Sequence, residues 1–73
     1  MSLPDYKVLI IDKDGQNSRR IADFLKEKGF DTETANTGEM GIEKIKIFKP
    51  KYVVVDLVLP DMNGFDFLDY LQA

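Results

Sequence analysis

The side chains best suited to chemistry are two aspartates that directly follow short apolar runs. Asp12 comes after Lys7–Ile11, and Asp56 comes after Tyr52–Val55. If these runs are neighbouring strands of one parallel sheet, both carboxylates lie outside its carboxyl edge, where open α/β sheets bind ligands. Clustered carboxylates suit a hard cation such as Mg²⁺, and an aspartate is also a nucleophile toward phosphoryl groups. A lone acid in such a place is usually a loop residue or a helix cap, but here two acids follow two strands.

The elements that must position these aspartates follow from the period of the apolar residues. We predict strands at Lys7–Ile11, Asp31–Ala35 and Tyr52–Val55, and helices at 16–28, 36–49 and 65–71. The middle helix opens at a capping box of Asn36 and Glu39 and is stopped by Pro50, while Gly29 ends the first helix. Alternating strands and helices predict a parallel sheet with helices on its faces, and Asp31–Ala35 is expected at an edge.

Apolar residues at helical or strand spacing identify the expected core. In the third helix, Phe65, Leu68 and Leu71 share one face. The loop from Asp56 to Gly64 contributes Met62, which could be buried or form part of a docking face with Phe65. The side chains expected to be buried are Phe24, Phe30, Ile42, Ile45, Phe48 and Leu68.

Composition limits the classes of function. The chain has 73 residues, room for one domain, and contains no cysteine and no histidine, which excludes a disulfide or a His-based nucleophile or zinc site within it. Net charge is −3 without a long basic run, so nucleic-acid binding by this segment and membrane-surface binding are not expected. No apolar stretch approaches the roughly 20 residues of a membrane span, and no signal peptide is expected. A cytoplasmic protein is the expectation.

The segment from Val53 to Gly64 is similar to the acceptor segment of response regulator receiver domains in two-component signalling. The shared pattern is an apolar strand, Asp, two residues, Leu or Met, Pro, two residues, Asp or Asn, and Gly. The first strand, the Lys28-Gly29-Phe30 turn and the helix start at 35–39 also resemble the family. This implies a flavodoxin-like, doubly wound parallel sheet truncated to β-α-β-α-β-α with strand order 2-1-3, so that residues 1–73 are the N-terminal part of a receiver domain.

The resemblance also implies a function. Asp56 would be the phosphoacceptor, and its phosphoryl donor would be a histidine kinase or a histidine phosphotransfer protein. The chain would be a signalling module of a phosphorelay and not an enzyme. Mg²⁺ would be held by Asp12, Asp56 and the backbone carbonyl of Val58.

Lys13 departs from the family, which has a second acid at this position. A lysine ammonium has three donors and no acceptor, so it cannot coordinate Mg²⁺. We expect Lys13 to weaken metal binding, with its ammonium partly filling the metal's place between Asp12 and Asp56. In an alternative, Lys13 points to solvent and Asp14 becomes a ligand. If metal binding is lost entirely, the chain is a pseudo-receiver, an interaction module that is not phosphorylated.

Two further expectations concern the loop after the first strand and the outer edge of the third strand. The segment from Leu9 to Gly15 resembles the nucleophile motif of haloacid-dehalogenase-like phosphatases, in which Asp12 would attack phosphate and Asp14 would be the acid/base. That reading does not explain the match from Asp56 to Gly64. The family's remaining strands and helices are not in the sequence, so strand 52–55 would have a bare apolar edge through which copies of the chain could associate.

Overall fold

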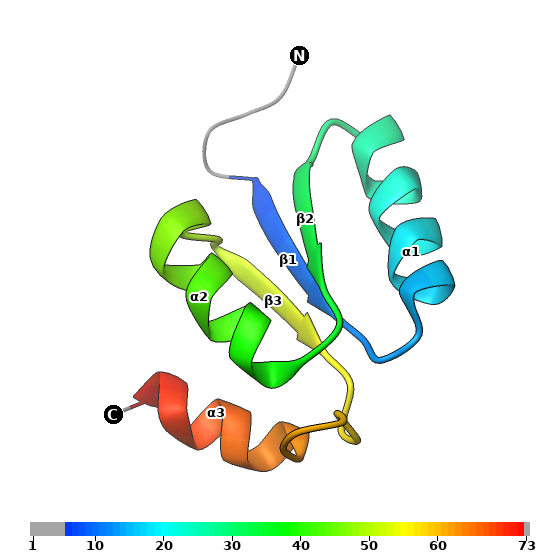
Figure 1. The fold of residues 1–73 in the computed structure, drawn as a ribbon. Coiled ribbons are helices and arrows are strands. Elements are labelled where there is room, and N and C mark those ends of the chain that lie inside the picture. Colours follow the sequence, from blue (N-terminus) through cyan, green and yellow to red (C-terminus); the bar gives the residue numbers. More distant parts are fainter. Residues whose placement is uncertain (1–5, 73) are drawn as a thin grey trace.

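The computed structural model describes residues 6–72, and it confirms the predicted alternation of three strands and three helices (Figure 1). The elements are β1 (Lys7–Ile11), α1 (Gly15–Glu27), β2 (Asp31–Ala35), α2 (Gly38–Phe48), β3 (Tyr52–Val55) and α3 (Gly64–Gln72). All three strands lie where the sequence predicts them, and the helix boundaries differ by one or two residues. None of the helices within the described residues has the length and apolar character needed to cross a membrane.

The three strands form one parallel sheet in the order β2-β1-β3. β1 is central, and Ile10 pairs with Thr34 on one side and with Val54 on the other. β2 is an edge strand as expected, because only β1 pairs with it among the described residues. Each face of the sheet has its own apolar cluster, as expected of a doubly wound sheet.

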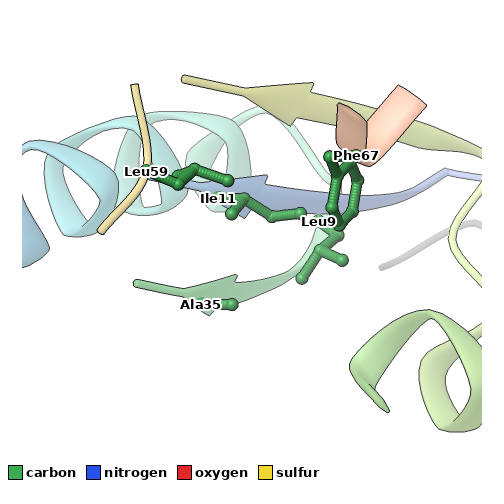
Figure 2. Close-up of a cluster of buried hydrophobic side chains, with 5 residues drawn as sticks. All are labelled: Leu9, Ile11, Ala35, Leu59 and Phe67. Carbon is green, nitrogen blue, oxygen red and sulfur yellow. The ribbon is translucent and has the colours of Figure 1, made fainter. Parts of the chain in front are cut away.

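The cluster under α1 contains Val8, Ile10 and Ala22, all buried. The cluster on the other face contains Leu9 and Ile11 of β1 together with Ala35, Leu59 and Phe67 (Figure 2). Side chains alternate between the faces of a strand, so the continuous apolar run of β1 supplies both clusters. α2 adds Ile42 and Ile45 to the second cluster.

Two of the expected core residues are wrong. Phe24 is 59% exposed and Leu68 is 40% exposed, whereas Phe67, which the sequence did not single out, is fully buried. α3 therefore turns a different face to the sheet from the one that Phe65, Leu68 and Leu71 predict. Phe30, Ile42, Ile45 and Phe48 are partly buried, as is Met62, while Phe65 is exposed.

Of the residues predicted to end or cap the helices, only the one at the start of α2 differs in the structure. α2 begins after Thr37, whose hydroxyl accepts a hydrogen bond from the N–H of Met40, so the predicted capping by Asn36 is wrong. Gly29 follows α1 with a φ of 95°, a conformation that favours glycine and ends the helix as predicted. Lys49 ends α2 in the left-handed region directly before Pro50.

β3 is less buried than a strand with neighbours on both sides. Tyr52 and Val54 are 48% and 46% exposed, while Val53 and Val55 are partly buried against the second cluster. Among the described residues only β1 pairs with β3, so the other edge of β3 has no strand beside it.

Candidate functional site

The sheet brings Asp12 and Asp56 together at its carboxyl end. Ile11 and Val55 are paired in register, and the N–H of Asp56 donates to the carbonyl of Ile11 across 2.8 Å. Asp12 directly follows Ile11 and Asp56 directly follows Val55, so the two aspartates lie side by side just past the paired strand ends. Both side chains line one pocket together with Asp14 and Asn17.

Asp12 is held in place by its own loop and by α1. The N–H of Asp14 donates to its Oδ1 at 3.0 Å, and the side-chain amide of Asn17 donates to its Oδ2 at 2.7 Å. The Asp14 N–H and the Asn17 amide are the main causes that hold the pKa of Asp12 below its ordinary value, because both bond to the charged form. Partial desolvation opposes this, and Asp56 and Lys13 add smaller lowering effects. Asp12 is therefore a fixed negative charge at neutral pH.

Asp56 is partly buried and begins a tightly folded loop. Its Oδ1 accepts the N–H of Val58 at 3.1 Å. Val58 and Asn63 form an isolated antiparallel bridge, whose two hydrogen bonds run from Leu59 N–H to Met62 and from Gly64 N–H to Leu57. These bonds flank Val58 and do not use its carbonyl, which leaves that oxygen available as a ligand.

Lys13 does not lie between the two carboxylates. Its side chain is exposed and forms no ion pair with any carboxylate of residues 6–72. The expectation that its ammonium fills the metal's place is therefore not met by this structure. Its positive charge still acts on Asp12 at longer range, where it lowers the pKa slightly.

Asp14 lines the pocket but has another role in the fold. Its Oδ1 accepts the N–H groups of Gln16 at 3.0 Å and Asn17 at 3.3 Å, which makes it the N-cap of α1. A helix N-terminus has N–H groups without partners inside the helix, and a capping carboxylate bonds to them. Both capping bonds use Oδ1, so only Oδ2 of Asp14 is without a hydrogen bond within residues 6–72.

The metal question depends on the donors that are present. Two carboxylates, from Asp12 and Asp56, and the Val58 carbonyl are oxygen donors that fit a hard cation. Within the described residues, no group of three or more acidic, histidine or cysteine side chains is arranged to hold a metal ion. The oxygen donors therefore fit Mg²⁺, but only two of them are carboxylates.

Sequence reasoning missed the role of Asp61 in this loop. Its carboxylate bonds to the first two N–H groups of α2, at Gly38 and Glu39. Asn63 caps α3 through Oδ1, which accepts the N–H of Asp66 at 2.8 Å. The Asn63 cap has a local signal, since an Asn precedes a helix start, but the Asp61 contact spans 23 residues and leaves no local pattern.

Comparison with known proteins agrees with this geometry. The family model described as "Response regulator receiver domain" matches residues 8–73. The acid tolerance regulatory protein ActR of Rhizobium meliloti is 38% identical over 70 residues, which are 96% of this chain and 36% of ActR. The cell cycle transcriptional regulator CtrA of Caulobacter vibrioides is 38% identical over 67 residues, covering 92% of this chain and 29% of CtrA.

A solved structure with the same fold is the non-phosphorylated HemR receiver domain from Leptospira biflexa. It superposes with a TM-score of 0.82 at 26% identity, over 89% of this chain and 52% of that one. The chain belongs to the response regulator receiver domain family of two-component signalling. It spans about a third of the relatives ActR and CtrA and about half of the HemR receiver domain.

Proposed function

We propose that this chain is the phospho-accepting part of a two-component phosphorelay and that Asp56 is the acceptor. The observation that carries the proposal is the pairing of Asp56 with Asp12 in one pocket at the strand ends. We propose a histidine kinase or a histidine phosphotransfer protein as the donor, and because these 73 residues contain no histidine, the phosphohistidine lies outside them. In this proposal the chain is a cytoplasmic signalling module and not an enzyme.

The reaction at Asp56 is a phosphoryl transfer. A carboxylate oxygen forms a bond to phosphorus while the phosphorus–nitrogen bond of the donor breaks, and the imidazole that leaves keeps the electron pair and takes up a proton. The product is an acyl phosphate with a charge of about −2, where the free carboxylate carried −1, so the pocket gains about one negative charge. The charge must be balanced, because Asp12 is held in its ionised form beside it.

Mg²⁺ would supply that balance by neutralising charge on the phosphoryl oxygens. Asp12, Asp56 and the Val58 carbonyl would hold the ion. Lys13 weakens this site, because it replaces an acid of the family pattern and adds a positive charge near Asp12. The side-chain amide of Asn17 donates a hydrogen bond to Oδ2 of Asp12 and so fixes the orientation of that carboxylate.

Lys13 also favours a second candidate, the pseudo-receiver. In that case the same fold is an interaction module and Asp56 carries no phosphoryl group. The phosphatase alternative depends on Asp14 as acid/base. It has less support, because the Asp14 carboxylate already caps α1 through two N–H bonds.

The test is intact-mass spectrometry of the chain after incubation with acetyl phosphate, with and without Mg²⁺. A gain of one phosphoryl group that is absent in Asp56→Asn supports the proposal. No gain in a sample that circular dichroism shows to be folded favours the pseudo-receiver. Hydrolysis of p-nitrophenyl phosphate that is lost in Asp12→Asn but kept in Asp56→Asn would favour the phosphatase.

We also propose that residues 1–73 are the N-terminal part of a receiver domain, comprising its first three strands and helices. In this form the outer edge of β3 is open. Asp56 bonds to β1 through its N–H, so by alternation Val53 and Val55 direct their backbone groups away from β1. Such an edge pairs with a second copy of the chain, and size-exclusion chromatography giving a folded monomer at all concentrations would contradict this.

A further inference from the structure

We propose that Asp61 is a positioning residue that ties the loop after Asp56 to the first turn of α2, so that a change at Asp56 is transmitted to that helix. The inference rests on Asp56 being the phosphoacceptor. Asp61 touches neither the pocket nor Asp12. It would act through the loop that both aspartates, Asp56 and Asp61, share.

The first contact is a pair of hydrogen bonds to α2. The N–H of Gly38 donates to Asp61 Oδ1 at 2.7 Å, and the N–H of Glu39 donates to Oδ2 at 2.9 Å. The hydroxyl of Thr37 accepts only the next N–H, that of Met40. The first N–H groups of a helix have no partner inside it, so α2 takes two of its N-terminal bonds from the acceptor loop.

The second contact is steric and adjoins the first. A β-carbon built on Gly38 would lie 2.5 Å from the sulfur of Met62, so the Met62 side chain lies directly against Gly38 and would have to move if this position carried a side chain. Met62 also packs against the apolar cluster of Leu9 and Phe67. Asp61 and Met62 therefore hold adjacent points of the loop on the same turn of α2.

Hydrogen bonds fix the loop that follows Asp56 at several points. At its start, Asp56 Oδ1 accepts the N–H of Val58 at 3.1 Å. Beyond it, the Val58–Asn63 bridge is closed by bonds of 3.1 Å and 2.8 Å. A new group on the Asp56 carboxylate would compete for the Val58 N–H, and the loop would carry the shift to its bonds with Gly38 and Glu39.

The charge state of Asp61 suits this role. The N–H groups of Gly38 and Glu39 hold the pKa of its carboxyl below the ordinary value, because they bond to the ionised form. The carboxylate is therefore charged at neutral pH, and it faces the positive end of the α2 dipole. Asp69, another exposed acid, makes no side-chain hydrogen bond or ion pair within residues 6–72, which makes it a matched control.

The experiment is a double-mutant cycle read by amide chemical shifts in nitrogen-15 NMR. The chains are wild type, Asp56→Asn, Asp61→Ala and the double variant, with Asp69→Ala in place of Asp61→Ala as the control. We expect Asp56→Asn to shift the Gly38 and Glu39 amides and to shift them less than about half as far when Asp61 is absent. The Asp69→Ala background should leave the shifts unchanged.

Equal shifts in both backgrounds, or none at Gly38 and Glu39 when Asp61 is present, would overturn the proposal. If Asp61→Ala does not fold, Asp61→Asn retains one acceptor oxygen and replaces it in the cycle, with an intermediate coupling expected. The cycle needs no phosphoryl group, so it reports on the contact separately from the mass measurement. Coupling without phosphoryl uptake would keep the positioning role and reject the acceptor role of Asp56.

Discussion

Replacing Phe67 by alanine is the most direct test of how α3 is attached. Phe67 is fully buried in the second cluster, where its ring lies beside Leu9 (Figure 2), and it is the only side chain from Phe65 to Leu71 that is buried. Truncating a buried phenylalanine costs about 3–5 kcal/mol. At about 0.05–0.15 kcal/mol per residue, a chain of 73 residues has a total stability of about 4–11 kcal/mol. The variant should therefore lose between about a quarter and all of its free energy of unfolding.

The assay is urea unfolding followed by far-ultraviolet circular dichroism. The matched control is Phe65→Ala on the same helix, where the side chain is 65% exposed. Surface changes of this kind usually stay within about 0.5 kcal/mol. The expected order of stability is therefore wild type close to Phe65→Ala, and both well above Phe67→Ala.

The reverse order would refute this packing. If Phe65→Ala were the more damaging change, α3 would pack through the face of Phe65, Leu68 and Leu71 that the sequence period indicates. Equal and small effects would mean that α3 is not docked on the sheet at all. In either case the position of Asn63, which caps α3, would need revision.

Three further predictions concern the site and the helix ends. Lys13→Asp should strengthen Mg²⁺ binding at least about tenfold, because it adds an oxygen ligand and removes a positive charge; unchanged affinity in a calorimetric titration would contradict the metal assignment. Thr37→Ala should destabilise the chain by about 1 kcal/mol, since the Met40 N–H loses its cap, and Thr37→Ser should restore it in thermal melts. The pKa of Asp61 is lower in the folded state than its ordinary value of 3.8, so the unfolded state binds more protons in acid. The stability that the Asp61 carboxylate adds is fully present above pH 3.8 and is lost as the pH falls below that value. The free energies of unfolding of the wild type and of Asp61→Asn should therefore become equal in acid. A difference that stays constant with pH would disprove the charged contact.

The sequence was most informative where structure is local. The three strands were predicted at the residues where they occur. Lys7–Ile11 and Tyr52–Val55 are short apolar runs bounded by polar residues, and Asp31–Ala35 alternates polar and small residues with Thr32 and Thr34. Gly29 and Pro50 marked helix ends correctly, since both act through the backbone of their own segment. The strand order 2-1-3 came from the family resemblance and not from these local patterns.

The sequence was least informative about which of two apolar faces a helix buries. In α3, Phe65 and Phe67 are both large and apolar, and helical period alone favoured Phe65 with Leu68. The choice depends on what lies opposite, and opposite α3 are Leu9 of β1 and Gly41 of α2, which leave room for the ring of Phe67. The sequence also left the start of α2 undecided by one residue, because Asn36 and Thr37 are both suitable caps and the structure uses Thr37.

For the site itself, the sequence alone determined that Asp12 and Asp56 share an edge, because each directly follows a strand of one parallel sheet. Only the tertiary structure decided what surrounds them. Lys13 is exposed, the Asp14 carboxylate caps α1, and the Asp61 carboxylate bonds to α2. The Asp14 cap is local and has a sequence signal, since Asp is a common residue directly before a helix. The bond from Asp61 to α2 joins residues 23 apart and forms only when the sheet has formed, so no local pattern of residue types encodes it.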